Sequence, residues 1–87
     1  MSLGLYVVKD VKACYQPQVY VFANDDVAKR FFYQLYRDAV DREPNSPLAS
    51  YPEDFNLYYI GSFDTDLGEV RSYPSTYVCC LKDFKEV

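Results

Sequence analysis

Hydrophobic and aromatic residues gather in short runs separated by polar segments, and each run has the composition of a β-strand. The runs cover residues 5–8, 18–22, 55–63 and 69–73 and are rich in Val, Tyr and Phe, which favour strands. Residues 76–81 are also strand-prone. Because Pro74 interrupts the pattern, they either extend the fourth strand or form a short fifth one.

One longer segment has the periodicity of a helix. Between residues 25 and 41, apolar side chains recur at spacings of three and four. These positions are Ala28, Phe31, Phe32, Leu35 and Ala39. Asn24 is a favourable N-cap, and Asp25 and Asp26 in the first turn match the positive end of the helix dipole. We therefore predict one amphipathic helix that ends at Glu43-Pro44.

The remaining segments read as loops and turns. Pro47 and Pro52 favour a loop over residues 45–54, with a single helical turn near 46–49, and Gly68 favours a hairpin turn over 64–68. The order is β-β-α-β-β, which predicts one α+β domain over residues 1–87, with a mainly antiparallel sheet and the helix packed on one face. Residues 82–87 are expected to form a flexible tail.

The predicted sheet has large apolar side chains on both faces, whereas one helix covers only one of them. Val19 and Val21 alternate with Tyr20 and Phe22, and the strand at 55–63 alternates in the same way. A homo-oligomer could bury the uncovered face, or the face could stay open for nucleic acid bases to stack on it. The candidate oligomer-interface residues are Tyr20, Phe22, Tyr58 and Ile60.

Composition and charge narrow the classes of function. The chain has 87 residues, is 49% hydrophobic and carries a net charge of −4, which disfavours disorder and strong non-specific attraction to nucleic acid. Residues 43–69 contain six acidic residues, while all nine Lys and Arg residues lie elsewhere. An anionic ligand would have to avoid that acidic region. Because no apolar run is long enough for a span and no secretory pattern precedes the first strand, we expect neither a membrane segment nor a signal peptide.

Catalytic and metal-binding signals are weak. The chain has no His, and its cysteines, Cys14, Cys79 and Cys80, suit small apolar positions in a reducing cytoplasm better than metal ligation. Asp64-x-Asp66-x-Gly68 is more typical of a tight hairpin turn than of a calcium loop. We find no arrangement for nucleophilic or acid/base catalysis, so we expect no enzyme, no cofactor and no metal.

Aromatic and basic residues suggest a nucleic-acid surface. Rings interleaved with cations are typical of proteins that bind single strands. The strand tyrosines Tyr6, Tyr20, Tyr58, Tyr59, Tyr73 and Tyr77 could form such a surface with Lys9, Arg71 and Lys82. Arg30 and Arg37 lie two helical turns apart on the predicted helix, with Tyr33 between them. These residues form either an ordinary solvated helix surface or an edge that contacts phosphates. The candidate binding residues are Lys9, Lys12, Lys29, Arg30, Tyr33, Arg37, Arg71 and Tyr73.

Three blocks of sequence resemble a known family. They are Asp10, Ala13 and Pro17; residues 24–31; and a third block from Ser-Pro-Leu at 46–48 through Tyr-Pro-Glu-Asp-Phe at 51–55 to Ile-Gly-x-Phe-Asp at 60–64, with Gly68 and Glu69. On these blocks the chain resembles the small non-structural protein of gokushovirus-type microviruses, which are phages with circular single-stranded DNA genomes. The resemblance implies a single-stranded DNA-binding protein that assists genome synthesis and packaging in the host cytoplasm.

A second hypothesis comes from a different class of function. In this interpretation the chain is an oligomeric scaffold that contacts viral replication or capsid proteins and binds little or no DNA. Two features favour this hypothesis. The predicted sheet has apolar side chains on both faces, and the acidic region at 43–69 could contact a basic surface of a partner.

Overall fold

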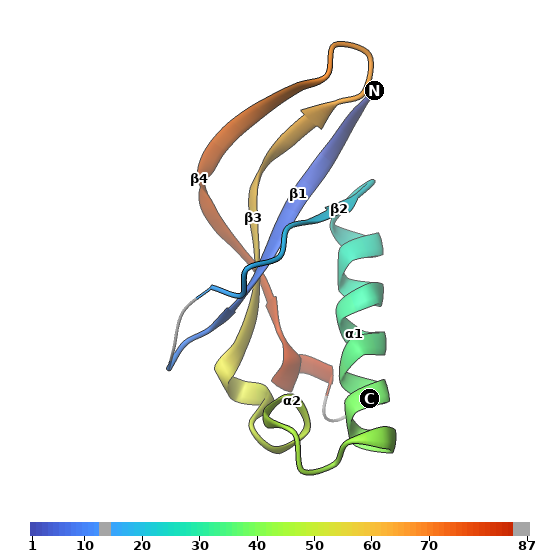
Figure 1. The fold of residues 1–87 in the computed structure, drawn as a ribbon, viewed down its shortest axis with the longest axis vertical. Coiled ribbons are helices and arrows are strands. Elements are labelled where there is room, and N and C mark those ends of the chain that lie inside the picture. The colour runs from blue at the N-terminus through green and yellow to red at the C-terminus, as the bar shows by residue number, and fades with distance from the viewer. Residues whose placement is uncertain (13–14, 85–87) are drawn as a thin grey trace.

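The computed structural model describes residues 1–12 and 15–84, and in this part of the chain a four-stranded antiparallel sheet packs on one long helix (Figure 1). The strands are β1 (Ser2–Asp10), β2 (Tyr20–Phe22), β3 (Phe55–Asp64) and β4 (Glu69–Cys80), in the sheet order β2-β1-β3-β4. The helices are α1 (Asp25–Arg42), the short α2 (Pro47–Ser50), and the 3-10 turns η1 (Pro52–Asp54) and η2 (Leu81–Phe84). The predicted α+β class and the order β-β-α-β-β are confirmed.

Helix α1 begins and ends where its sequence signals predict. The Asn24 side chain accepts a hydrogen bond from the Val27 amide at 3.0 Å, and the Glu43 amide donates to the Ala39 carbonyl at 2.9 Å. Ala28, Phe32 and Ala39, three residues of the predicted apolar stripe, are buried. The helix therefore lies with that stripe against the sheet.

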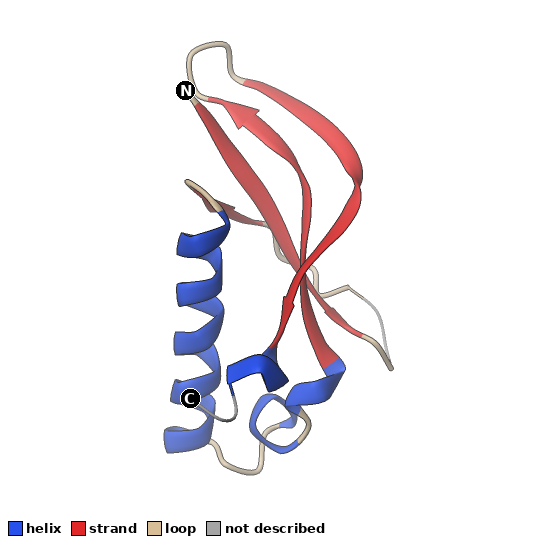
Figure 2. Ribbon diagram, turned by 180° about the vertical axis from the view of Figure 1, so that it is seen from behind, coloured by secondary structure: helices blue, strands red, loops and turns tan. Residues whose placement is uncertain are grey.

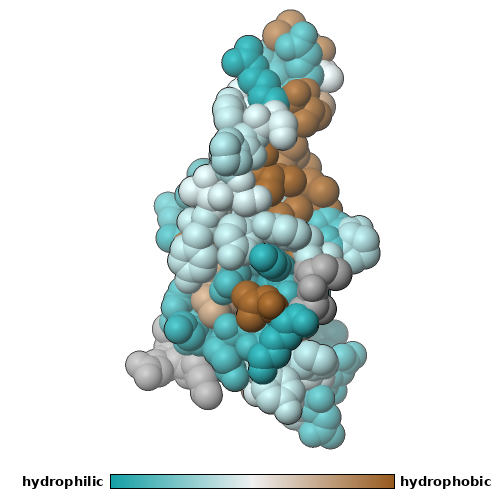
Figure 3. All heavy atoms as spheres, turned by 90° about the vertical axis from the view of Figure 1, so that its left-hand side faces the viewer, coloured by the Kyte–Doolittle hydropathy of each residue, from teal (hydrophilic) through white to brown (hydrophobic). Residues whose placement is uncertain are grey.

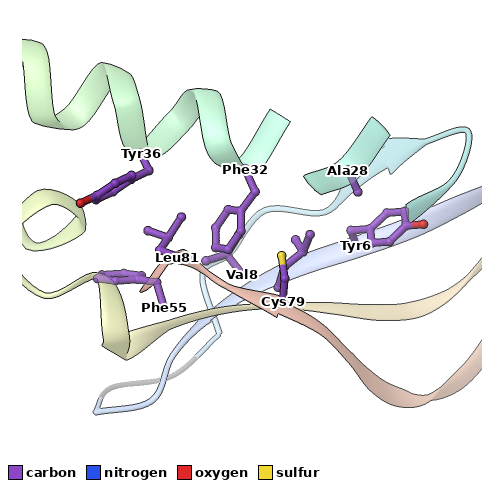
Figure 4. Close-up of a cluster of buried hydrophobic side chains, with 9 residues drawn as sticks. Tyr6, Val8, Ala28, Phe32, Tyr36, Phe55, Cys79 and Leu81 are labelled. Atoms are coloured by element: carbon purple, nitrogen blue, oxygen red, sulfur yellow. The ribbon is translucent and has the colours of Figure 1, made fainter. Parts of the chain in front are cut away.

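The core lies between α1 and one end of the sheet (Figure 4). Tyr6 and Val8 of β1 and Leu57 of β3 meet Phe32 of α1, and each of these side chains is at most 1% exposed. Leu81 of η2 closes the core at the end of β4. Residues 82–84, expected to be part of a flexible tail, belong to this 3-10 turn, and the Asp83 carboxylate accepts a hydrogen bond from the Cys80 amide at 3.0 Å. Cys14 and tail residues 85–87 lie outside the described residues.

The sheet is longer than the helix that covers it. The molecule measures 42 × 23 × 19 Å, and β1, β3 and β4 continue past the start of α1 as a twisted ribbon (Figures 1 and 2). We call this projecting part, residues 1–5 and 60–73, the arm. At its tip the Leu67 and Asp66 amides donate to the Asp64 carboxylate and hold the pKa of Asp64 below its usual value. Gly68 supplies the positive φ of the turn, 67°.

An irregularity in the middle of the sheet changes which side chains share a face. Tyr6 pairs with Tyr59 but Leu5 pairs with Gly61, so Ile60 is an extra residue in β3. Since side chains alternate along a strand, one extra residue moves everything beyond it to the other face. The predicted single face from Phe55 to Phe63 is therefore correct only as far as Tyr59. Pro74 lies in the matching irregularity of β4, which is one strand and includes residues 76–80.

The four predicted oligomer-interface residues do not form one surface. Tyr20 and Phe22 pack against Phe31 of α1, with ring centroids 5.0 and 5.1 Å apart, so they belong to the face that the helix covers. Tyr58 lies on the opposite face, and Ile60 is the extra residue of β3. Because α1 covers the aromatic side of β2, the four residues do not share one face of the sheet, and their role in an oligomer interface stays a prediction. No helix in the described part of the chain is long and apolar enough to cross a membrane.

Candidate nucleic-acid interface

Three tyrosines form a row on the sheet face opposite α1, which we call the open face. Tyr58 of β3 lies edge-to-face with Tyr15 on one side and with Tyr77 of β4 on the other, at centroid distances of 5.9 and 6.1 Å. We call Tyr15, Tyr58 and Tyr77 the tyrosine row. The Lys9 ammonium lies 5.2 Å from the centre of the Tyr15 ring. A cation therefore stands at one end of a row of aromatic rings.

Backbone pairing places each ring of the row. Val7, Tyr58 and Tyr77 are direct cross-strand partners on β1, β3 and β4. Tyr15 joins them because the chain returns beside β1: Lys9 and Tyr15 form an isolated bridge, and the Gln16 amide donates to the Val8 carbonyl at 2.8 Å. Val7 is only 6% exposed although α1 lies on the other side of the sheet, which indicates that the rings lie over it.

The row combines rigidity with access to solvent. Tyr77 is 54% exposed and Tyr15 41% exposed, whereas Tyr58 between them is half-buried. Burial, followed by the nearby Asp83 charge, raises the pKa of Tyr77. The phenol therefore stays neutral at physiological pH and adds no negative charge to the row. Neutral, partly exposed rings held by strands are suited to stacking with planar ligands.

A second aromatic cluster lies on the helix side of the sheet, at the base of the arm. Tyr59 contacts Tyr6 edge-on at 5.6 Å and stacks with Tyr73 at 6.0 Å and 16° between ring planes. The Tyr6 hydroxyl donates to Asp25 at 2.6 Å, and burial together with this bond raises the pKa of Tyr6 far above its usual value. A hollow of about 440 Å³ beside the cluster is lined by Asp25 and Asp26 among others. These carboxylates make this hollow unfavourable for phosphate.

The structure does not bring the eight predicted binding residues together. Lys9 lies on the open face, while Lys12 follows β1 and forms an ion pair with Asp54 at 3.5 Å. Arg71 and Tyr73 lie on the helix side of the arm. The remaining four, Lys29, Arg30, Tyr33 and Arg37, belong to α1. Arg30 and Arg37 are exposed on the side of α1 away from the buried stripe, far from the tyrosine row.

The acidic segment at 43–69 does not form one acidic surface. Glu43, Glu53 and Asp54 lie near α2, at one end of the molecule, whereas Asp64, Asp66 and Glu69 lie at the tip of the arm, at the other end (Figure 1). The tyrosine row lies on the strands between these two ends. An anionic chain that crosses the middle of the open face would therefore avoid both acidic groups.

Tyr15 is the member of the row that sequence reasoning missed. It lies in a turn-like segment two residues before Pro17, where no strand periodicity marks it. Its role depends on the chain folding back beside Lys9, which only the three-dimensional pairing reveals. Tyr58, Tyr77 and Lys9 were all present in the wider predicted set of rings and cations, but that set mixed residues from both faces of the sheet.

Comparisons with known proteins agree with a phage origin. The family model described as "Phage ORF5 protein" matches residues 3–84. "Protein ORF5" of Chlamydia phage 1 is 36% identical over 75 residues, which are 85% of this chain and 74% of that relative. No solved structure matches the chain. The resemblance to a small phage protein is thereby confirmed, and the chain belongs to the Phage ORF5 protein family.

Proposed function

We propose that this phage protein binds single-stranded DNA through the open face of its sheet. The observation that carries the proposal is the tyrosine row, with the Lys9 ammonium 5.2 Å from the Tyr15 ring. Each stacked base contributes about 1–3 kcal/mol in single-strand binders, and stacking tolerates any sequence because every base has a π-face. The rings would hold bases while Lys9 meets a phosphate.

The charge distribution predicts modest affinity. The chain is negative overall, at −4, and within the described residues Lys9 is the cation that contacts a ring of the row. Few phosphates would therefore be neutralised, and the dependence of affinity on salt would be shallow, since its slope follows the number of phosphates contacted. Stacking rather than phosphate contact would supply most of the binding free energy.

We further propose that this binding assists genome synthesis or packaging in the cytoplasm of the host cell, without an enzymatic activity. A protein that coats or marks single strands needs a surface for bases rather than a catalytic pocket, and the open face is such a surface. Membership of a phage family supports a role in the phage cycle.

The proposal is tested by titrating a labelled oligothymidine at about 20 mM and about 200 mM salt. Tyr77→Ala should weaken binding about tenfold, as expected for the loss of one stacked base. Tyr51→Ala is the matched control, because Tyr51 is 55% exposed but lies next to α2, away from the row. Equal affinities for both variants and the wild type, or no binding at low salt, would contradict the proposal.

The alternative function is an oligomeric scaffold that contacts viral replication or capsid proteins with little or no DNA binding. Exposed apolar side chains on the arm favour it: Leu67, in the turn at the tip, is 66% exposed, and Val70, on the open face, is 64% exposed. A chain that binds no oligonucleotide at low salt but retains purified replication or capsid protein of its phage on a column would favour this alternative over the first.

A further inference from the structure

In the described part of the chain, no strand pairs with the outer edge of β4. β4 is the last strand of the sheet, and every residue from 69 to 77 is exposed. An exposed edge strand offers unpaired amide and carbonyl groups to another strand, and proteins usually cover or interrupt such edges. Here irregular pairing begins after Ser72, so the regular part of the edge is 69–72, where Glu69 to Ser72 pair in sequence with Asp64 to Gly61.

An apolar strip on the open face of the arm runs up to this edge. Leu3, Phe63 and Val70 are cross-strand partners on β1, β3 and β4, and Leu5 continues the strip along β1. Val70, the outermost member, is 64% exposed. Figure 3 shows hydrophobic atoms gathered along one margin of the projecting upper part of the molecule. The strip stops where β4 ends the sheet, so a further strand would continue it.

The charges beside Val70 are self-complementary. Glu69 and Arg71 flank Val70 on the other face of the arm, and neither forms an ion pair within the described residues. If a second copy of β4 lies antiparallel with Val70 opposite its own counterpart, Glu69 of each copy comes opposite Arg71 of the other. Opposite charges in directly facing positions stabilise strand pairs, whereas like charges destabilise them.

We propose that a second copy of this chain docks on the β4 edge, antiparallel and centred on Val70. The two sheets join into one, and the apolar strips of the two arms meet at the junction. The two-fold axis creates two Glu69–Arg71 pairs between the copies, and these pairs favour this partner strand and this register. This interface is isologous, since the same patch serves both copies.

The tip of the arm leaves room for this partner. The Thr65 amide donates to the Met1 carbonyl at 2.8 Å, and the Met1 ammonium lies 2.8 Å from the Asp66 carboxylate. These contacts tie the tip to the start of β1, on the side of β3 away from β4. The outer edge of residues 69–72 therefore stays clear.

The symmetry also fixes how the open faces lie. In an antiparallel pair of identical strands, the two-fold axis is perpendicular to the sheet, so equivalent faces of the two copies lie on the same side. Both tyrosine rows would therefore share one side of the joined sheet, and both α1 helices the other. The dimer contact and the rows use different residues, so loss of either leaves the other measurable.

Charge-swap variants test the proposal by sedimentation without DNA. Glu69→Arg places like charges opposite each other in the homodimer, and so does Arg71→Glu, so each variant should dimerise about tenfold more weakly than the wild type. An equimolar mixture of the two variants restores both opposite pairs and should recover the dimer. A wild type that stays monomeric at about 100 μM overturns the proposal, and so do single variants that dimerise like the wild type or a mixture that does not recover.

A cysteine at the symmetry centre gives a second measurement that does not depend on charge. Val70→Cys places two thiols at the distance of a directly opposed strand pair, about 4.5–5.5 Å between Cα atoms, which suits a disulfide. Mild oxidation should then give a covalent dimer. Ser72→Cys is the matched control, since Ser72 lies opposite Gly68 in this register and its counterpart is too distant. Cross-linking of the control but not of Val70→Cys would overturn the register.

Discussion

At the scale of the single residue, Cys79 shows how burial changes the chemistry of a side chain. The thiol lies in the core beneath α1 and is 6% exposed, as a small apolar residue would be (Figure 4). Burial, with a further contribution from Asp83, raises the pKa of Cys79 to about 12. An exposed thiol in the unfolded chain has a pKa of about 8.5. The folded state therefore keeps a proton that the unfolded state loses.

This difference predicts a loss of stability at alkaline pH. The contribution of Cys79 is fully present below about pH 8.5 and is lost as the pH rises toward 12, because the unfolded state then binds fewer protons than the folded state. The free energy of unfolding, measured by urea denaturation under reducing conditions, should fall between pH 8 and pH 10. In Cys79→Ala the fall should be shallower, and parallel pH profiles for the two proteins would contradict the assignment.

At the scale of the element, local signals fixed some boundaries and tertiary contacts fixed the others. The bounds of α1 could be predicted because Asn24 caps it and its apolar stripe has one period throughout. The faces of β3 could not be predicted beyond Tyr59, since the extra residue at Ile60 leaves no mark in the hydrophobic pattern. The side of β2 that meets the helix also depended on packing, because both Tyr20 and Val21 are compatible with a core.

Substitution by alanine should lower the stability of the protein by different amounts at the two glycines of the β3–β4 hairpin. A Cβ on Gly61 would overlap the Arg71 carbonyl oxygen across the strand pair, and backbone cannot move aside as a flexible side chain can. Gly61→Ala should therefore cost about 3 kcal/mol, as for overpacking at a tight contact. Gly68 has open space around it, so Gly68→Ala should cost about 1 kcal/mol for its positive φ alone. Chemical denaturation measures both, and a larger cost at Gly68 would contradict this account of the arm.

At the scale of the whole molecule, the decisive feature is that the helix covers only one face and one end of the sheet. The sequence predicts the uncovered apolar surface, but it does not predict that the surface divides into a tyrosine row in the middle and an apolar strip on the arm. The acidic segment likewise divides between the two ends of the long axis. The first division follows from the extra residue at Ile60, which changes the faces of β3, and the second from the length of the hairpin, which carries its acidic tip away from α2.

The two proposed binding surfaces, one for DNA and one for a second copy of the chain, lie on different parts of the sheet. The tyrosine row would hold DNA, and the edge of β4 would hold a second copy of the chain. The candidate cations on α1, Arg30 and Arg37, lie outside both surfaces. A binding site on α1 and a binding site on the open face therefore predict contacts with different residues, which a residue-resolved measurement separates.

That measurement is amide chemical-shift mapping of the unmodified protein during titration with an oligothymidine at low salt. If bases stack on the open face, the amides of Lys9, Tyr15, Tyr58 and Tyr77 should shift together, and those of Arg30 and Arg37 on the outer side of α1 should stay unchanged. Shifts confined to α1, or no shifts at all, would contradict the assignment of single-stranded DNA binding to the tyrosine row.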